Sequence, residues 1–268
     1  GLDKTDEDYT VDEVFISRAQ MDESDAKQAE KDKQHAIKEY KQQSRALEGC
    51  NRCLDNRETI KHLIVSVGSK AYLALPAHTP LTSGHCLIIP AQHISCSVQA
   101  DEDVWEEIQR FRRALVSMLS EEEEDCVFFE SAMNLKKWPH MVTECVPLPR
   151  EVGDLAPIYF KKAILESEGE WTQNKKLIEL RGRDIRRAVP KALPYFSCDF
   201  GNESGFAHVI EEEREFPKNF AQEIIGGMLD LDHSIWRKPK REDFELQMAR
   251  INEFKEKWKK YDFSTKTE

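Results

Sequence analysis

Long apolar runs are missing from this sequence of 268 residues. None of its hydrophobic stretches approaches the roughly 18 residues that a helix needs to cross a bilayer. The N-terminal residues also lack the apolar core of a secretory signal peptide. The sequence therefore predicts neither a membrane-spanning segment nor a membrane partner.

The cysteines lack the regular spacing of a disulfide framework. There are seven of them, an odd number, and most lie in apolar or ligand-like surroundings. Disulfide-stapled domains usually carry an even number of cysteines at framework-like spacings. The pattern therefore favours a reducing compartment, in which the thiols stay free or bind a metal.

The chain also lacks an excess of positive charge. It carries 50 acidic and 39 basic residues, which gives a net charge of -11 at pH 7. A protein that coats nucleic acid without specificity would need the opposite balance. A local basic patch remains compatible with this composition.

Residues 171–191 form such a patch, with seven basic and two acidic residues. We expect Arg183, Arg186 and Arg187 to share a helical face, from which they could contact phosphates. An ordinary solvated helix face is the alternative, and composition alone favours it. The residues considered as candidates for RNA or phosphate binding are Lys136, Lys137, Lys175, Lys176, Arg181, Arg183, Arg186 and Arg187.

Composition divides the chain into three parts. Residues 1–49 are highly charged and form an arm that is partly helical or disordered, with a solvated helix predicted at 22–47. Residues 50–150 are typical of a compact α+β domain, and residues 151–268 of a second one, with the boundary near 147–157. In the first domain we expect strands at 62–67, 71–75, 86–89, 126–130 and 141–146, a helix at 101–119 and an exposed loop at 121–125. In the second we expect helices at 159–168, 172–180, 217–229 and 244–260, and strands at 193–200 and 205–210.

Four potential metal ligands lie in or around residues 84–96, which read GHCLIIPAQHISC. Cys50 and Cys53 form a C-x-x-C motif, which by itself indicates a redox site, half of a metal site, or a coincidence. The residues that follow do not provide the context of a thioredoxin-like redox site. His93 and His140 each lie at the edge of a predicted strand, from where they could complete a tetrahedral zinc site. A hydrogen-bonded structural histidine is the alternative for each of them.

The order of three motifs resembles the histidine-triad superfamily of nucleotide hydrolases and transferases. The motifs are a C-x-x-C, then G-H-x-L-I-I-P-x-x-H, then a strand that begins with histidine. In zinc-bearing members the corresponding residues bind zinc, which implies a zinc site made of Cys50, Cys53, His93 and His140. The triad segment reads HMVTECV, so Val142 stands where the superfamily has its nucleophilic histidine. Valine has no lone pair that could attack phosphorus. The resemblance therefore implies a pseudoenzyme without a catalytic residue.

Two residues after Val142 bear on this expectation. Glu144 takes the place of the third triad histidine. Cys145 is a possible substitute nucleophile, but side chains alternate along a strand, and this places Cys145 on the opposite face from Val142 and Glu144. We therefore expect no replacement nucleophile in the triad pocket.

A longer resemblance is to the CwfJ family of late splicing factors, and it extends over residues 50–240. The segments that carry it include CNRCL, LTSGHCLIIPAQHIS, HMVTECVPLPREVGDLAPIYFKKAI and PYFSCDFG. This resemblance implies the C-terminal half of a larger nuclear protein with two tandem CwfJ domains, the first of them histidine-triad-like. The partners that it implies are spliceosomal proteins, branched intron RNA and the lariat debranching enzyme.

We therefore expect an α+β fold, with a histidine-triad-like domain that has an antiparallel sheet and a zinc site, followed by a second, smaller α+β domain. The expected function is that of a non-catalytic RNA- and protein-binding module of a pre-mRNA splicing factor. It would act in the nucleus at the intron-lariat spliceosome and assist lariat debranching or spliceosome disassembly. The alternatives are a nucleotide hydrolase or phosphodiesterase of the histidine-triad type, and a protein scaffold without affinity for RNA.

Overall fold

The computed structural model describes residues 11–169 and 172–265 of the chain. The chain divides into two compact units, residues 1–46 and residues 47–268. Most of the first unit is α1 (Val11–Glu48), a helix of 38 residues that contains neither glycine nor proline. The large apolar side chains described on it are exposed, namely Ile16, Ile37, Leu47 and Tyr40, the last of which is 71% exposed. Residues 22–47 are therefore helical as predicted, although the helix begins earlier.

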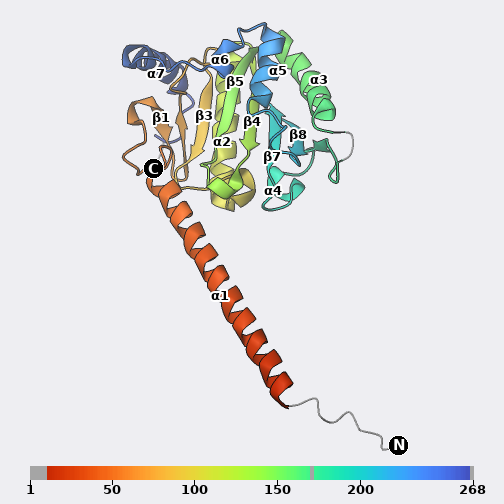
Figure 1. Ribbon diagram of the computed structural model, residues 1–268. Helices are drawn as coiled ribbons and strands as arrows, with labels where there is room; N and C mark the ends of the chain where they lie inside the picture. Colours follow the sequence, from red (N-terminus) through yellow and green to blue (C-terminus); the bar gives the residue numbers. More distant parts are fainter. Residues whose placement is uncertain (1–10, 170–171, 266–268) are drawn as a thin grey trace, which may run out of the picture. The chain divides into compact units, whose positions relative to one another are not determined.

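The second unit is built on one antiparallel sheet of eight strands, in the order β1-β2-β3-β5-β4-β7-β8-β6 (Figure 1). All the strand pairs in this sheet are antiparallel. The strands are β1 (Ile64–Val67), β2 (Ala71–Ala74), β3 (Cys86–Pro90), β4 (Glu124–Ala132), β5 (Thr143–Pro149), β6 (Ile178–Glu179), β7 (Tyr195–Phe200) and β8 (Glu203–Val209). The predicted α+β fold with an antiparallel sheet is confirmed.

Six α-helices and three short 3-10 helices complete the described part of this unit. The α-helices are α2 (Glu102–Glu121), α3 (Arg150–Glu166), α4 (Ile185–Ala188), α5 (Phe220–Leu229), α6 (Ser234–Arg237) and α7 (Phe244–Trp258). The 3-10 helices are η1 (Lys61–Leu63), η2 (Ser97–Gln99) and η3 (Leu135–Lys137). Among the described residues, no helix combines the length and the apolar character that spanning a bilayer requires.

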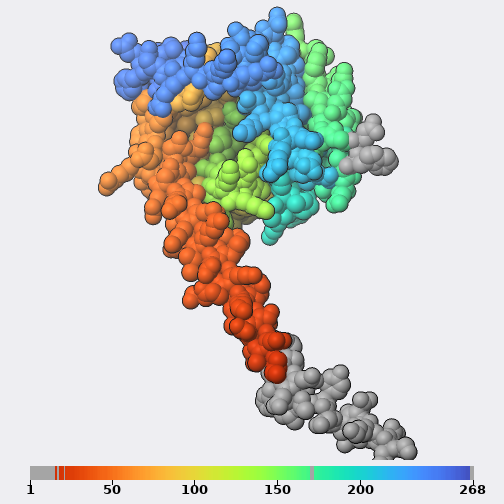
Figure 2. Space-filling view, viewed as in Figure 1, coloured from red at the N-terminus to blue at the C-terminus, as the bar shows by residue number. Residues whose placement is uncertain are grey.

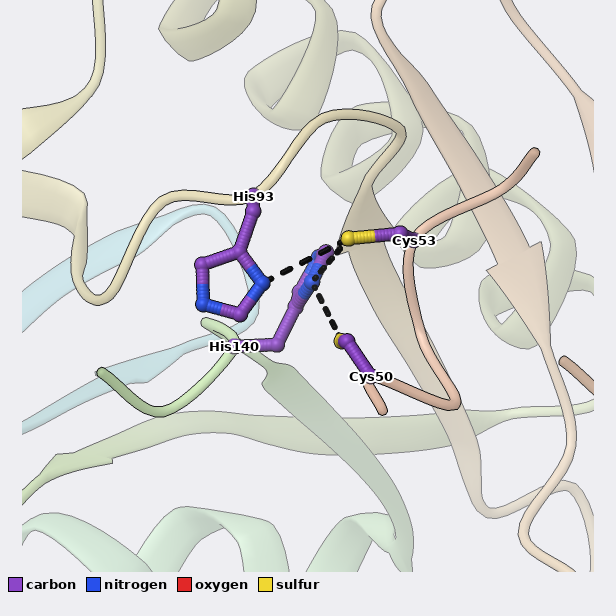
Figure 3. Close-up of side chains that lie close together, drawn as sticks. All are labelled: Cys50, Cys53, His93 and His140. Carbon is purple, nitrogen blue, oxygen red and sulfur yellow. Dashed lines mark hydrogen bonds between the residues drawn. The ribbon is translucent and has the colours of Figure 1, made fainter. Parts of the chain in front are cut away.

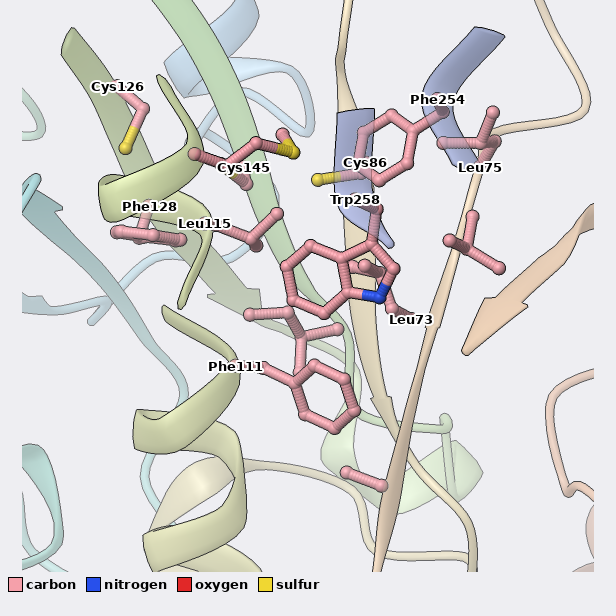
Figure 4. Close-up of a cluster of buried hydrophobic side chains, with 14 of the residues drawn as sticks. Leu73, Leu75, Cys86, Phe111, Leu115, Cys126, Phe128, Cys145, Phe254 and Trp258 are labelled. Carbon is pink, nitrogen blue, oxygen red and sulfur yellow. The ribbon is translucent and has the colours of Figure 1, made fainter. Parts of the chain in front are cut away.

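α2 covers one face of the sheet because its apolar residues recur at helical spacing. Ile108, Phe111 and Leu115 have no exposed surface and pack against β2, β3 and β4. α7 adds Trp258, whose indole stacks on the Phe111 ring with the centroids 6.1 Å apart (Figure 4). Residues from the C-terminal part of the chain therefore complete the core of the first predicted domain.

α3 and α5 cover the opposite face of the sheet (Figure 1). Phe160 of α3 stacks on Phe196 of β7 with the ring centroids 6.3 Å apart, and both rings are fully buried. Side chains alternate between the two faces, so Phe128 of β4 packs beneath α2 while its neighbour Phe129 packs beneath α3. Burial on both faces explains why the sequence of β4 shows a continuous apolar run.

The two predicted domains share this sheet. β4 pairs with β5 along one edge and with β7 along the other, so strands from both sides of the predicted boundary are continuous. The residues near that boundary, 147–157, lie in the end of β5 and the beginning of α3. The sequence showed a change of composition there, but it could not show that β4 and β7 pair.

Several predicted elements differ from the structure. Residues 172–180 were expected to be helical but contain only β6, because Ile178 pairs with Ala207 of β8 and Glu211 accepts hydrogen bonds from the backbone amides of Gln173 and Asn174. The acidic run 121–125 is only partly a loop, since β4 begins at Glu124. β5 begins at residue 143, two residues later than predicted.

The prediction that Arg183, Arg186 and Arg187 share one face of a helix is also wrong. α4 has only four residues, and Arg183 precedes it. Gly182, with a φ of +76°, provides the left-handed turn that separates Arg183 from the preceding strand. Arg186 and Arg187 are consecutive, so they point in different directions from the helix axis. The charge run therefore follows an irregular segment with a single short helix.

Candidate metal centre and adjoining pocket

Three loops of the second unit bring the four predicted metal ligands together. Cys50 and Cys53 lie in the turn that precedes η1, His93 lies in the loop after β3, and His140 lies in the loop before β5. Backbone hydrogen bonds connect these loops: the amide of residue 54 donates to the carbonyl of residue 91 at 3.0 Å, and the amide of residue 141 donates to that of residue 94 at 2.7 Å. The ligands are therefore positioned by backbone pairing and not only by their own side chains.

The ligand atoms face one common point (Figure 3). The Nδ1 atom of His140 lies 3.3 Å from Cys50 Sγ and 3.6 Å from Cys53 Sγ, and the Nδ1 atom of His93 lies 3.4 Å from Cys53 Sγ. All four ligand atoms lie within 4.8 Å of one another. Zinc with Zn–S and Zn–N bonds of about 2.3 and 2.0–2.1 Å in a tetrahedron gives ligand–ligand distances of about 3.3–3.8 Å. The three sulfur–nitrogen distances lie in this range, and two thiols with two imidazoles are a donor set that zinc binds.

The outer nitrogens of both histidines fix the tautomer that a metal requires. His93 Nε2 lies 2.9 Å from the carbonyl oxygen of Trp138, and His140 Nε2 lies 2.8 Å from that of Pro90. A carbonyl only accepts hydrogen bonds, so each Nε2 carries the proton and each Nδ1 presents its lone pair to the cluster. Backbone carbonyls commonly orient metal-binding histidines in this way. The four residues could therefore hold a metal ion.

Burial sets the protonation states in the absence of a metal. It raises the pKa of the Cys53 thiol to about 12 and lowers the pKa of the His140 imidazole to about 4. At neutral pH the thiol is therefore protonated and the imidazole is neutral. A cation that binds between them must displace the proton of the thiol, whereas the neutral imidazole can coordinate the cation without losing a proton.

A pocket of about 400 Å³ adjoins the segment that carries the triad. It lies where residues 51–89 meet residues 219–241, which are coloured orange to gold and blue in Figure 2. Its apolar lining includes Val142, Leu87 and Ile89. Arg52 and Arg241 supply positive charge at its wall. The pocket therefore combines an apolar floor with a few polar and basic groups, which is typical of a ligand site.

The triad side chains take up structural roles in this pocket. Val142 packs against an apolar cluster that includes Leu87. The carboxylate of Glu144 accepts a hydrogen bond from His85 Nε2 at 3.0 Å. His85 Nδ1 accepts one from the backbone amide of Leu81 at 3.1 Å, so the proton is on Nε2. Both nitrogens of His85 are therefore engaged, and neither presents a free lone pair to the pocket.

Cys145 lies away from the pocket. It is 1% exposed and belongs to the core cluster beneath α2, opposite Cys86 on β3 (Figure 4). Burial holds its pKa well above the usual range. A protonated thiol in an apolar core is a poor nucleophile. The predicted orientation of Cys145 is confirmed.

The predicted phosphate-binding residues differ in their exposure to solvent. Lys136 and Lys137 are exposed on η3, and neither lines the pocket beside Val142. Arg186 is mostly buried because it pairs with Asp184 at 3.0 Å and with Glu102 at 2.9 Å. Lys176 is half-buried and its Nζ lies 3.5 Å from the carbonyl of residue 165, whereas the exposed members of the set are Lys175, Arg181, Arg183 and Arg187.

Sequence reasoning missed the rim of the pocket. Three side chains line it there: Asn219 immediately before α5, Gln222 in α5 and Trp236 in α6. They lie far along the chain from the triad and have no local motif. Arg52 stood inside the C-x-x-C motif, where its charge could have been noticed. Arg241 could not have been found without the backbone bridge that it forms with His78.

Comparisons with known proteins agree with the predicted family. A family model described as "Protein similar to CwfJ C-terminal" matches residues 37–161, and one described as "Protein similar to CwfJ C-terminus 2" matches residues 170–264. CWF19-like protein 2 is 52% identical over 262 residues in Danio rerio and over 264 residues in Homo sapiens. These matches cover 97% and 98% of this chain.

More distant relatives are similar over shorter parts of the chain. Pre-mRNA-splicing factor cwf19 of Schizosaccharomyces pombe is 29% identical over 209 residues, which is 75% of this chain. The chain spans 27%, 30% and 33% of the lengths of the Danio, human and Schizosaccharomyces proteins. It is thus similar to one part of each of these longer proteins.

Two solved structures resemble the fold at low identity. A Zn-bound histidine triad family protein from Mycobacterium smegmatis has a TM-score of 0.26 at 14% identity, over 32% of this chain and 64% of that one. A hypothetical histidine triad nucleotide-binding protein from Sulfolobus tokodaii has a TM-score of 0.28 at 14% identity, over 75% of this chain and 91% of that one. Since the two CwfJ models together match most of its length, the chain belongs to the family of proteins with CwfJ C-terminal domains.

Proposed function

We propose that this chain is a non-catalytic RNA- and protein-binding module of a pre-mRNA splicing factor. The support is its membership of the CwfJ family and its similarity to a protein named as a pre-mRNA-splicing factor. The module acts in the nucleus at the intron-lariat spliceosome and assists lariat debranching or spliceosome disassembly. Its partners are spliceosomal proteins and branched intron RNA, with the lariat debranching enzyme as a further candidate.

The composition of the triad pocket carries the non-catalytic part of this proposal. Val142 occupies the position from which a histidine would attack phosphorus, and its side chain is packed among apolar residues. His85 is held by Glu144 and by the backbone of Leu81. Cys145 lies in the core on the other side of the strand. We therefore expect none of these groups to form a covalent phosphoryl intermediate.

We propose that Cys50, Cys53, His93 and His140 hold a structural zinc ion. A site with four protein ligands leaves no open position for water or substrate, so the ion would supply folding free energy and not Lewis-acid chemistry. It would join the C-x-x-C turn to the loops before β5 and after β3. His140 would then be a metal ligand, which leaves the triad segment without a free histidine.

RNA binding is the part of the proposal that depends on exposed basic groups. Lys175, Arg181, Arg183 and Arg187 are all exposed, and they lie within one stretch of the chain. Contacts from such groups to phosphates position RNA without reading its sequence. The expected binding is therefore weakly dependent on sequence and strongly dependent on salt.

The deciding experiment combines a binding and a turnover measurement. The metal-loaded chain is incubated in excess over dinucleoside polyphosphates, adenylated substrates and a 2′–5′ branched RNA, and product formation is followed. We expect retention of the branched RNA without product. Product formation that disappears in His85→Gln, with metal content and thermal stability unchanged, would instead establish an enzyme.

A histidine-triad type hydrolase is the second candidate, because the pocket of about 400 Å³ could still admit a nucleotide. Arg52 and Arg241 at its wall could contact a phosphate. Nucleotide binding without turnover would be consistent with the first proposal, and turnover would favour the second. Absence of any salt-dependent RNA affinity would leave the protein scaffold as the remaining interpretation.

A further inference from the structure

A second cleft, of about 530 Å³, lies between α2, the loop that leads into α4 and the turn between β7 and β8. It opens on the other face of the sheet from α3 and α5. Along β7, Phe196 and Cys198 pack into the cluster beneath α3 and α5, so Ser197 and Asp199 point to the opposite side. Both of these polar side chains line the cleft. It is therefore separate from the pocket beside Val142.

Two residues of α2 that line this cleft each carry a buried side-chain nitrogen without a hydrogen-bond acceptor among the described residues. The nitrogens are Nε2 of Gln109 and Nε of Arg112. Buried donors in folded proteins are nearly always satisfied, by protein, by water or by a ligand. The two nitrogens are themselves almost completely shielded from solvent, so they show a shortage of acceptors on this side of α2 and are not direct contacts for a ligand.

The carboxylates of the cleft wall do not satisfy this demand. Asp199 accepts from Arg112 Nη1 at 2.7 Å and from the amide of Gly205 at 2.9 Å, one bond on each oxygen. Asp184 accepts from the amide of Arg186 at 2.8 Å and from its Nη2 at 3.0 Å. The negative charge of both aspartates is therefore already paired, which leaves Glu203 as the remaining carboxylate of the lining.

Two further guanidinium groups lie at the mouth of the cleft. Arg113 and Arg183 line it and are exposed, and within residues 11–169 and 172–265 no ion pair is found for either. Arg183 Nε donates to the carbonyl of Glu179 at 3.3 Å, which leaves its two Nη groups available. Glu203 also lines the cleft and is exposed, and no ion pair of its carboxylate is found among the described residues. Guanidinium groups bind phosphate oxygens with a matching fork of donors.

We propose that this cleft binds a phosphodiester group of single-stranded RNA. The inference rests on the proposed function and gives its RNA contacts a location. Trp105 lines the cleft, but Arg186 lies over its ring at 5.0 Å, so the indole is not free to stack on a base. The cleft therefore reads the backbone and not the base sequence. Arg181 and Arg187, exposed on either side of Arg183 along the chain, continue the positive charge beyond one phosphate, which fits a polyanion better than a single phosphorylated side chain.

The test is fluorescence anisotropy of a labelled single-stranded RNA with the full 268-residue chain. The double variant Arg113→Gln/Arg183→Gln removes the two mouth charges, and both residues are exposed and free of described ion pairs, so folding should persist. We expect roughly tenfold weaker binding and a slope of log K against log salt that is smaller by about 1.4, which is about 0.7 for each phosphate-contacting residue on a single strand. The matched control is Lys161→Gln/Lys162→Gln on α3, which removes the same charge from another surface and should leave both values unchanged.

Each outcome decides the inference. An unchanged affinity and salt slope in the double variant, with a wild-type chain that binds RNA, would overturn the cleft and leave the proposed function intact. Equal losses in the double variant and in the α3 control would also overturn it, because general charge would then explain the binding. A wild-type chain that binds a phosphoserine peptide but no RNA would overturn both. Loss in the double variant alone, with an unchanged melting temperature, would support the cleft.

Discussion

Replacing one cysteine of the metal cluster gives the sharpest prediction. Cys53→Ser substitutes a hard oxygen for a thiolate sulfur whose atom lies 3.4 Å from His93 Nδ1 and 3.6 Å from His140 Nδ1. The serine hydroxyl does not ionise at neutral pH and is a poor zinc ligand. We expect the purified variant to contain much less than one metal ion per chain, whereas the wild type contains about one.

The expected loss of stability follows from linkage. Mutation of an outer-shell partner of a metal ligand typically weakens binding 10–100-fold, so loss of a direct ligand should weaken it at least about 1,000-fold. With metal saturating the wild type, that factor corresponds to about 4 kcal/mol of unfolding free energy. For a compact unit of the size of residues 47–268, 1 kcal/mol shifts the melting temperature by about 2–4 °C. The melting temperature should therefore fall by roughly 8–16 °C.

The assay is elemental analysis together with thermal unfolding, with and without a chelator. The matched control is Cys198→Ala, a buried cysteine of β7 that lies outside the cluster, which should retain the metal and lose only about 1 kcal/mol. A wild-type chain without metal, or a Cys53→Ser variant that keeps both its metal and its melting temperature, would refute the reasoning.

Further predictions concern a buried carboxyl group and a tight helix contact. Burial raises the pKa of the Glu130 carboxyl group above its value in the unfolded chain, which is about 4.3. The free energy of unfolding therefore decreases as the pH rises from the pKa of the unfolded state to the higher pKa of the folded state. Across that window Glu130→Gln should therefore gain stability relative to the wild type by up to about 1.4 kcal/mol per pH unit in urea titrations, and a pH-independent difference would contradict this. In α5 an added Cβ at Gly226 would lie 2.0 Å from Trp236 Cη2, so Gly226→Ala should cost about 1–3 kcal/mol by chemical denaturation. Gly227→Ala is the control: nothing lies within 4 Å, and the better helix propensity of alanine should stabilise the fold by up to about 1 kcal/mol, so equal effects at both positions would contradict the contact.

Local patterns predicted the local parts of this fold well. The helical spacing of Ile108, Phe111 and Leu115 identified α2, and the apolar run before Pro90 identified β3. Residues 172–180 failed because their conformation is set by distant partners, Ala207 and Glu211, which a helix-like composition does not reveal. Tertiary contacts of this kind override weak local preferences.

The candidate site divides in the same way. Cys50, Cys53, His93 and His140 could be chosen because each belongs to a motif with a chemical meaning, and the structure brings all four together. The rim of the neighbouring pocket could not be chosen, since its asparagine, glutamine and tryptophan are common residue types that acquire a role only through the packing of α5 and α6. The same holds for the second cleft, which α2 forms with the turn between β7 and β8, far along the chain.

The position of β4 between β5 and β7 has a consequence for dissecting the protein. A fragment that ends after the first family match would leave Val127–Ala132 without β7, and this edge would expose the backbone of a strand that is apolar on both faces. Unprotected strands of this kind associate with other chains and aggregate. The complementary fragment would lose the strand against which β7 is aligned. Insolubility of either half would therefore be explained by the loss of a strand that both halves need. Binding experiments can be interpreted only with fragments that keep residues 47–268 together.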